Sequence, residues 1–302
     1  MKAAYIDEYG GPDVLKYGDL PDPVPGPDEI LVKVAAASIN PVDTMERSGE
    51  TKAWNPLKFP CVLGWDLSGT VQALGPGVTH LKVGDKVFAW AFHTYAELCV
   101  VAADLVAKVP EGLDLVEVAA LPLASLTGSQ LISVGAGVKA GQTVLVSGAV
   151  GAVGRAAVFA AKDLGAHVIA GVQTKRLSEA DALGADRVLA LDDESAVQAL
   201  PYVDAVANTV RGRTAERLLL KVKPGGVFAS ATGAPANATE YPSVRTVAFV
   251  SKKDPKGMLY IAEAVLAKKL AIPIGRKLGL RNAASGHVLV ERGGSGKVLL
   301  VP

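Results

Sequence analysis

Three glycines, Gly148, Gly151 and Gly154, lie between an apolar β-branched run and a run that favours helix. A turn of this type lets the backbone approach a pyrophosphate, and the N–H groups at the start of the following helix can bind the anion. A strand–helix packing turn without a ligand is the alternative. The turn opens a series of strands and helices, which favours a dinucleotide site. We expect this site to comprise Gly148, Ala149, Val150, Gly151, Ala152, Val153 and Gly154.

A basic segment follows the next expected strand, residues 167–173. Sites that prefer NAD place an acidic residue at the end of this strand to bind the ribose hydroxyls. Here the first acid is Glu179, and the strand is followed by Thr174, Lys175 and Arg176. A hydroxyl and two cations suit a 2′-phosphate, so the sequence predicts NADPH as cofactor. A solvated loop with two soluble cations is the alternative.

The segments around these residues alternate between strand and helix patterns. Strands are expected at 143–148, 167–173, 187–191, 203–210 and 226–233, with helices between them, including 151–164 and 214–223. Such alternation predicts an α/β, doubly wound parallel sheet of the Rossmann type.

The first 110 residues have a different pattern, with short apolar runs between Pro- and Gly-rich turns. They predict a compact β-rich domain or partial barrel. From Asp114 a helix is expected, broken or kinked at Pro122. The last strand, 297–301, is expected to return to the first domain. We therefore expect one domain from residues 1–122 with 257–302, and a cofactor domain from 123–256.

Composition limits the possible functions. The chain has 31 basic and 30 acidic residues, and this net charge of +1 gives no footprint for nucleic acid or an anionic membrane. The cysteines, Cys61 and Cys99, are too few for a structural zinc site or a disulfide framework, which favours a reducing cytoplasm. The N-terminus lacks the apolar core of a secretory signal, and the apolar stretch 143–161 contains three glycines and Arg155, unlike a membrane span.

Short motifs along the whole chain resemble the medium-chain dehydrogenase/reductase superfamily, in its zinc-free quinone oxidoreductase and alkenal (enone) reductase branch, the zeta-crystallin type. They are Ser38–Asp43, the segment from Gly64, Gly84–Val87, Tyr95–Glu97, Leu121–Ile132, the glycine turn, Leu183–Asp186 and Gly296–Val298. The resemblance implies a GroES-like β-rich catalytic domain beside the Rossmann domain. It also implies a homodimer that transfers a hydride from NADPH to a quinone or an α,β-unsaturated carbonyl.

The resemblance also bears on metal content. Zinc-dependent relatives carry a Cys ligand near position 38 and a His-Glu pair after Gly64. This chain has Ser38 and Trp65-Asp66 there, and none of its four histidines forms a ligand-like pair. We therefore expect no metal, and four histidines with ordinary surface or packing roles.

Individual roles follow by likeness to the family. Asn40 matches an asparagine of the nicotinamide and substrate cleft and is the candidate donor to the developing enolate, together with a cofactor ribose hydroxyl, while water supplies the last proton. Lys175 and Arg176 match residues that hold the 2′-phosphate. Further cofactor contacts are implied for Thr127, Asn208, Thr209, Gly233, Phe249 and Val250.

The chain departs from the family pattern at two positions. Met45 stands where some quinone reductases have a tyrosine, which leaves an aromatic substrate contact open, and Leu191 stands where a tyrosine often lies against the cofactor. Two other functional classes remain as alternatives. One is a non-enzymatic NADPH-binding protein, crystallin-like or a sensor, because fold does not fix function. The other is an alcohol dehydrogenase, which the missing zinc ligands disfavour.

Overall fold

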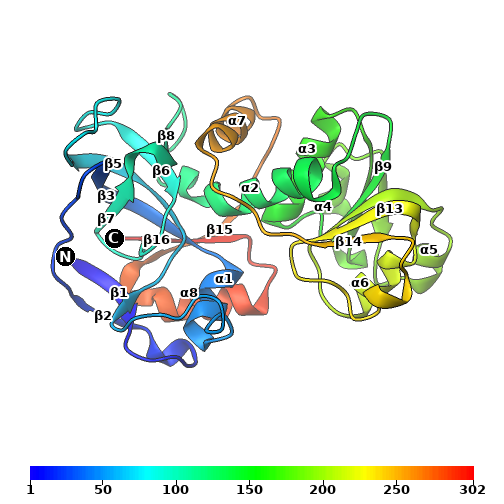
Figure 1. Cartoon of the computed structure of the whole chain (residues 1–302), viewed down its shortest axis with the longest axis horizontal. Coiled ribbons are helices and arrows are strands. Elements are labelled where there is room, and N and C mark those ends of the chain that lie inside the picture. The colour runs from blue at the N-terminus through cyan, green and yellow to red at the C-terminus, as the bar shows by residue number, and fades with distance from the viewer. The chain divides into compact units, whose positions relative to one another are not determined.

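The computed structural model describes residues 1–302 and divides into two compact units. The first unit comprises Met1–Leu123 and Lys253–Pro302, and the second comprises Ala124–Lys252 (Figure 1). The boundaries expected from sequence, 122/123 and 256/257, fall within four residues of these. None of the helices combines the length and hydrophobicity that a membrane crossing needs.

The first unit is built on two β-sheets. One has the order β2-β1-β4 and is antiparallel; the other has the order β15-β16-β3-β5-β6-β8, with β7 also paired to β3. The strands are β1 (Lys2–Ile6), β2 (Lys16–Asp19), β3 (Glu29–Ile39), β4 (Cys61–Val62), β5 (Asp66–Leu74), β6 (Lys86–Trp90), β7 (Leu98–Ala102), β8 (Val106–Lys108), β15 (Ile274–Gly279) and β16 (Lys297–Val301).

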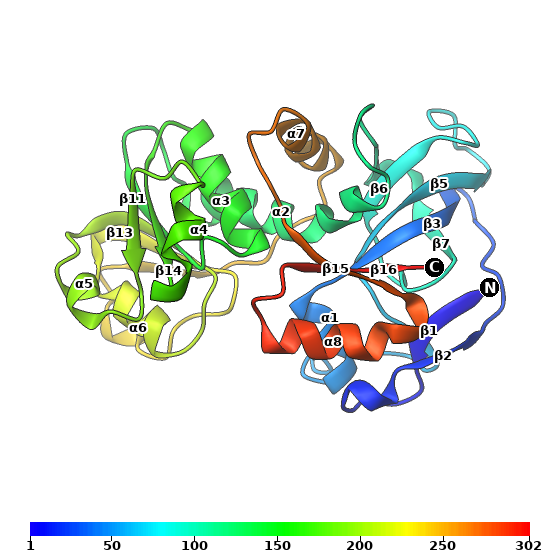
Figure 2. The same cartoon turned by 180° about the vertical axis from the view of Figure 1, so that it is seen from behind.

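Strand β3 is central to this unit because it pairs with β5, β7 and β16. Its alternating residues Ile30, Val32 and Val34 enter one hydrophobic core, as expected for a strand with side chains on alternate faces. Three helices belong mainly to this unit: α1 (Pro41–Ser48), α7 (Pro255–Leu266) and α8 (Ala283–Arg292). Helix α8 packs against β16 and α1 (Figure 2).

The second unit contains a six-stranded parallel sheet of order β11-β10-β9-β12-β13-β14. Counted from β9, this is the 3-2-1-4-5-6 order of the Rossmann fold, which confirms the predicted fold class. The strands are β9 (Thr143–Ser147), β10 (His167–Val172), β11 (Arg187–Ala190), β12 (Val203–Asn208), β13 (Val222–Ser230) and β14 (Arg245–Ala248). The helices are α2 (Pro122–Gln130, crossing the unit boundary), α3 (Ala152–Asp163), α4 (Leu177–Asp181), α5 (Glu194–Gln198) and α6 (Arg213–Leu219).

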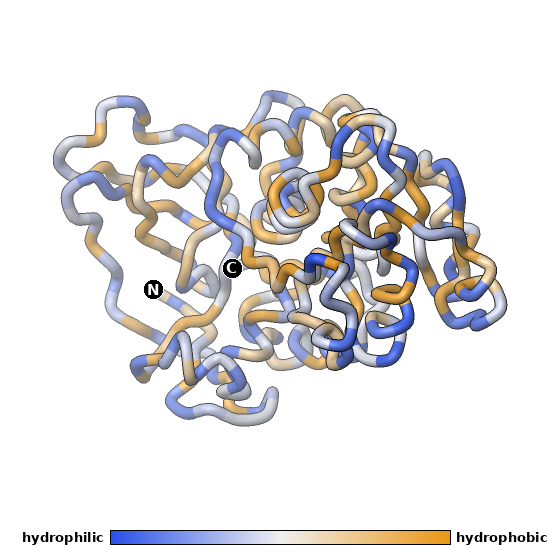
Figure 3. Tube along the Cα trace, turned by 45° about the vertical axis from the view of Figure 1, so that its right-hand side comes forward, coloured by the Kyte–Doolittle hydropathy of each residue, from blue (hydrophilic) through white to orange (hydrophobic).

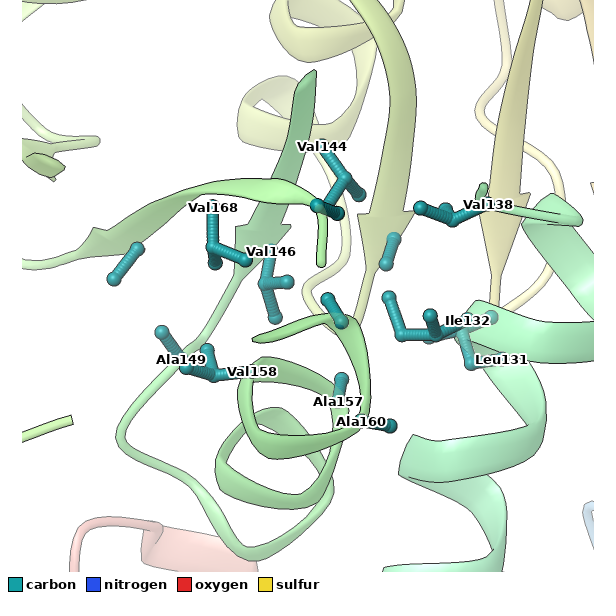
Figure 4. Packing of buried hydrophobic residues seen from close by; sticks show 14 of the residues in the cluster. Leu131, Ile132, Val138, Val144, Val146, Ala149, Ala157, Val158, Ala160 and Val168 are labelled. Carbon is teal, nitrogen blue, oxygen red and sulfur yellow. The ribbon is translucent and has the colours of Figure 1, made fainter. Parts of the chain in front are cut away.

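Small side chains let helix α3 pack closely on the sheet. Ala157 and Val158 of α3 face Val146 of β9 and Val168 of β10 in one buried cluster (Figure 4). Hydrophobic and hydrophilic stretches alternate along the chain (Figure 3). Burying the apolar face of each element stabilises the sheet and fixes the loops at its carboxyl edge.

Several elements differ from the sequence-based expectation. The helix expected from Asp114 does show the break expected at Pro122, but the part before it is only a 3₁₀ segment, Glu117–Ala120. Helix α2 begins at Pro122, where a missing N–H costs nothing, and is followed by a π-helical segment, Leu131–Ala136. Strand β13 starts at Val222, inside a stretch expected to be helical, because Val222 pairs with Val203. Strands β14 and β15 were not expected, and both owe their conformation to pairing with β13 and β16.

Candidate active site

The glycine turn follows β9, and each of its glycines has a separate structural reason. Gly148 adopts a left-handed φ of +63°. A Cβ on Gly154 would lie 2.2 Å from the carbonyl oxygen of Gly148, so helix and turn can touch only without a side chain. Gly151 is exposed, and a Cβ there would have only one neighbour within 4 Å, the Gly148 carbonyl oxygen at 3.3 Å. The middle glycine is therefore the place where a ligand can approach the backbone.

Helix α3 begins directly after this turn with Gly151 as its N-cap residue, and no side chain caps it. The first N–H groups of a helix have no intrahelical acceptor, and the helix dipole makes this end attractive to anions. The turn lies where the strand order of the sheet reverses, between β9 and β12. In open parallel sheets, this carboxyl-edge position is where ligands bind.

The basic segment after β10 forms a short 3₁₀ turn, and two of its residues are bonded to carboxylates. Arg176 donates from Nε and Nη2 to Glu179 at 2.8 and 2.7 Å. Thr174 donates from its backbone N and its Oγ1 to Asp192 Oδ1 at 2.7 and 2.8 Å. The Arg176 guanidinium lowers the pKa of Glu179. Lys175 is exposed, and the structure gives its side chain no hydrogen bond.

Asn208 and Thr209 hold the carboxyl ends of neighbouring strands together. Asn208 is fully buried; its Oδ1 accepts from Ser147 Oγ at 2.8 Å, and its Nδ2 donates to Val210 O and Ser230 Oγ at 2.7 and 2.9 Å. Thr209 Oγ1 donates to Ser147 O at 2.7 Å. These bonds join β9, β12 and β13 beside the glycine turn, so the Asn208 side chain supports the turn and has its donors already used.

The remaining candidates in the second unit lie in varied surroundings. Thr127 Oγ1 is 2.9 Å from Ser251 Oγ, a bond that joins α2 to the segment after β14. Phe249 packs on the hydrophobic core, close to Gly135, whereas Val250 is exposed. Gly233 has a left-handed φ of +91° and open space around it. Their roles toward a cofactor stay predictions.

Asn40 belongs to the first unit, where it is part of a buried quartet with Ser38, Asp66 and Lys297. Asp66 Oδ2 accepts from Ser38 Oγ at 2.6 Å and from Asn40 Nδ2 at 2.8 Å, while Oδ1 accepts from the backbone N of Leu123 at 2.8 Å. Lys297 Nζ donates to Asn40 Oδ1 at 2.8 Å. All four residues are buried, with at most 6% of each residue exposed. Burial lowers the pKa of Lys297, and the Asp66 charge opposes this shift.

Helix α1 connects this quartet to a second buried group. Asn40 is the N-cap of α1, and its backbone N donates to Asp43 Oδ2 at 2.7 Å. Tyr95 donates its hydroxyl to the same oxygen at 2.8 Å. Burial raises the pKa of Asp43 well above its usual value. These bonds fix the position of Asn40 from the backbone side.

The histidines were expected in ordinary surface or packing positions. His287 is fully buried, its Nδ1 lies 3.3 Å from Nη1 of Arg47, and its ring lies perpendicular to that of Tyr95 at 5.8 Å between centroids. Burial lowers the pKa of His287 to about 3. His80 and His93 each bond a backbone carbonyl oxygen.

Sequence reasoning missed the carboxylates that hold the basic segment and the contact between Lys297 and Asn40. Lys297 lies in the Gly296–Val298 motif, but its apolar strand carries no local signal that it meets Asn40. Glu179 follows Arg176 by three residues, a spacing that permits a bond on a helical turn and could have been read. Asp192 follows the next strand, so its approach to Thr174 comes from parallel pairing of β10 and β11.

Two protein families match the chain. Residues 26–111 match the alcohol dehydrogenase GroES-like domain, and residues 152–260 match the zinc-binding dehydrogenase domain. Together with the observed fold they define the class, the medium-chain dehydrogenase/reductase superfamily. The second description names zinc, whereas the structure has no group of three or more His, Cys, Asp or Glu side chains that could hold a metal ion.

Among solved structures, the quinone oxidoreductase from Coxiella burnetii is 31% identical over the whole chain and 99% of its own, with a TM-score of 0.90. The Escherichia coli quinone oxidoreductase complexed with NADPH is 26% identical, covers both chains fully and has a TM-score of 0.89. An NAD-dependent alcohol dehydrogenase is 31% identical over both full chains, with a TM-score of 0.88.

Among curated proteins, the chloroplastic NADPH-dependent alkenal/one oxidoreductase of Arabidopsis thaliana is 32% identical over 78% of the chain and 63% of its own length. Alignments with the first curated relatives span 60% and 52% of their lengths. The chain belongs to the medium-chain dehydrogenase/reductase superfamily, in its quinone oxidoreductase and alkenal reductase branch.

Proposed function

We propose that this protein is a zinc-independent, NADPH-dependent reductase that transfers a hydride to a quinone or an α,β-unsaturated carbonyl. The observation that carries the proposal is the buried quartet. Ser38 and Asp66 stand at positions where zinc-dependent relatives place metal ligands. In this chain, both are hydrogen-bonded within the quartet, whose positive charge is the Lys297 ammonium. A hydroxyl and one carboxylate, already paired, form a poor donor set for zinc, which prefers thiolate and imidazole ligands.

The second unit has the features that NADPH requires. The cofactor, when bound, supplies the hydride from its nicotinamide ring. The backbone from Gly148 to Gly154 would hold the pyrophosphate, and Lys175 with Arg176 would hold the 2′-phosphate. Arg176 must exchange its bond to Glu179 for the phosphate, whereas Lys175 is free to approach it. The likeness to the NADPH-dependent alkenal/one oxidoreductase of Arabidopsis thaliana and to the Escherichia coli quinone oxidoreductase complexed with NADPH supports this choice.

Asn40 is the proposed donor to the oxygen that gains charge during hydride transfer. One hydrogen of its Nδ2 is used on Asp66 at 2.8 Å, and the other has only a long contact with Ser38 O at 3.4 Å. A polarised amide held in one orientation can stabilise an oxyanion without reorganising. Removing one such donor costs about 10²-fold or more in turnover, so Asn40→Ala should lower turnover while the Kd for NADPH changes little.

The test is NADPH oxidation against a panel of quinones, enones, aldehydes and alcohols, with zinc measured by elemental analysis on the same sample. The proposal expects turnover with quinones or enones at less than one-tenth zinc per chain, unchanged after chelation. A non-enzymatic NADPH-binding protein would bind NADPH and oxidise none with any acceptor. An alcohol dehydrogenase, the activity named for one solved neighbour, would need one zinc per chain and oxidise alcohols. Either result would overturn the proposal.

We also propose a homodimer and a cytoplasmic location. Strand β14 ends one edge of the parallel sheet, and an edge strand offers unpaired backbone groups to a second copy. Cys61 and Cys99 are free, buried thiols, which suits a reducing compartment. Light scattering coupled to gel filtration tests the first proposal: a mass of one chain at micromolar concentration would exclude the dimer.

A further inference from the structure

A cavity of about 530 Å³ lies within the first unit, beside α1 and the segment that leads into β5. Its lining includes Glu46, Leu57, Cys61, Trp65, Phe92 and His93. This volume is in the range of pockets that bind small molecules, and the lining combines aromatic walls with a few polar groups, as such pockets do. None of these six residues belongs to the buried quartet.

Trp65 forms an aromatic wall of this cavity. Its ring centroid lies 4.9 Å from that of Phe92, edge to face at 85°, and 5.9 Å from that of Trp90, stacked at 26°. Phe92 is 43% exposed and lines the cavity. Lys253 Nζ lies 4.2 Å from the Phe92 centroid. In a chain with three tryptophans, two pack together at this place.

A buried carboxylate fixes the orientation of this wall. Glu46, which is 3% exposed, accepts from Trp65 Nε1 at 2.7 Å and from Asn55 Nδ2 at 2.6 Å. The only polar atom of the indole is thereby satisfied, so Trp65 presents apolar surface to the cavity. Glu46 lies on α1, whose N-cap is Asn40, and Trp65 directly precedes Asp66. The same two segments therefore position the cavity wall and the proposed oxyanion donor.

The cavity also offers a polar group and an unreactive thiol. His93 Nδ1 is 2.8 Å from Val62 O, and because a carbonyl oxygen only accepts, this nitrogen carries a hydrogen and leaves Nε2 for a ligand. Burial raises the pKa of the Cys61 thiol to about 11. The thiol is protonated at neutral pH and does not attack an electrophilic acceptor.

We infer that this cavity binds the planar aromatic ring of the acceptor, such as a fused-ring quinone, in contact with the indole of Trp65. The inference deepens the proposed function and rests on it, since it assigns the ring-binding part of the substrate site. An aliphatic enone, which has no ring to place there, gains nothing from Trp65. The chain therefore selects aromatic acceptors over aliphatic ones of equal reactivity.

Binding is measured first, without cofactor, so that it does not depend on activity. The probe is 2,3-dimethyl-1,4-naphthoquinone, whose blocked ring positions prevent addition of thiols, and the method is titration calorimetry. Trp65→Leu should weaken binding about three- to tenfold, the range expected for losing an aromatic partner. Trp54→Leu is the matched control, because Trp54 is 61% exposed and outside the cavity lining. Phe92→Leu, at a half-exposed ring, gives a second variant if Trp65→Leu does not fold.

Kinetics then link the cavity to reduction. The ratio of kcat/KM for the naphthoquinone to that for 3-penten-2-one should fall by the same factor in Trp65→Leu, mainly through KM for the quinone. Trp65→Phe should keep most of the ratio. Equal quinone binding by wild type, Trp65→Leu and Phe92→Leu would overturn the inference even if the enzyme is active. Trp65-dependent binding without any NADPH oxidation would instead overturn the proposed function and leave the cavity as a ring-binding site.

Discussion

The Nζ atom of Lys297 lies 2.8 Å from Oδ1 of Asn40, and the two residues are 257 positions apart in the chain. An ammonium only donates hydrogen bonds, so the Asn40 oxygen must face it and the Asn40 NH₂ group must face Asp66. The orientation of the amide is thereby fixed by its partners. Lys297 thus acts on Asn40 as a positioning residue and supplies the buried positive charge of the quartet.

Replacing Lys297 with Met should lower turnover more than it weakens cofactor binding. Asn40 loses the partner that orients it, and Asp66 is left as a buried carboxylate without its cation. Breaking a buried pair in this way costs about 3–5 kcal/mol of stability, so urea unfolding must accompany the kinetics. Lys297→Met/Asp66→Asn should recover part of that stability, and turnover should stay low. Lys277→Met, which removes an exposed lysine paired with Glu117, is the control. Normal turnover in folded Lys297→Met would remove Lys297 from the account.

The double variant Lys175→Ala/Arg176→Ala tests the basic segment. Hydrogen bonds to charged groups contribute about 1.5–3 kcal/mol each, and solvent exposure reduces this. We expect the Kd for NADPH to rise about tenfold or more at fixed ionic strength, while the Kd for NADH changes little. Arg187→Ala is the matched control, because Arg187 is the first residue of β11 and lies at the amino edge of the sheet, whereas the basic segment lies at the carboxyl edge. If wild type binds NADH as tightly as NADPH, the assignment of this segment is wrong.

Glu179→Gln should tighten NADPH binding. In the unliganded protein, Arg176 is bonded to Glu179 through two nitrogens, and this bond must break when Arg176 contacts a phosphate. Exposed ion pairs contribute about 0.2–1 kcal/mol, so the expected gain is up to about fivefold. Fluorescence titration of NADPH and NADH by wild type and variant measures it. Unchanged or weaker NADPH binding would show that Glu179 does not compete with the cofactor.

His287 should make stability depend on pH. Its pKa is lowered to about 3 in the folded protein, while in the unfolded chain it is near its ordinary value. Between the two pKa values, the unfolded state binds a proton on His287 and the folded state does not. The contribution of His287 to the free energy of unfolding is therefore complete above about pH 6.5 and is lost as the pH falls toward 3. His287→Gln should reduce the slope of unfolding free energy against pH in this window by up to about 1.4 kcal/mol per unit.

The contribution of Asp43 to the pH dependence of stability has the opposite sign to that of His287. Because its raised pKa favours the protonated form in the folded state, this contribution to stability falls as the pH rises. Comparison of variant with wild type cancels this contribution. Urea unfolding at several pH values between 4.5 and 7 is the measurement. Parallel slopes for the two proteins would show that His287 titrates normally.

Some parts of the fold and of the candidate site could be predicted from the sequence, and others depend on contacts between residues far apart in the chain. The glycine turn was predictable because three glycines at this spacing, between a strand pattern and a helix pattern, are typical of a dinucleotide-binding turn, and the alternating elements around it predict the sheet. Strands β14 and β15 were not predictable, since their residues lack alternation and depend on their neighbours. The contacts of Lys297 with Asn40 and of Glu46 with Trp65 were not predicted, because a charged residue in an apolar strand or a short helix does not indicate which distant residue it will contact. The bonds of Asn208, likewise, follow from three strands meeting at one edge.

The most direct test of hydride transfer uses NADPH that carries deuterium on the transferred side of C4, with an aryl enone as acceptor and protein treated with a chelator. Hydride transfer to the β-carbon places one deuterium there, where it does not exchange with water. Mass spectrometry and NMR should find one deuterium at the β-carbon of the saturated ketone, with yield equal to the NADPH consumed. A product without that deuterium, or one formed only after zinc is added back, would contradict the account.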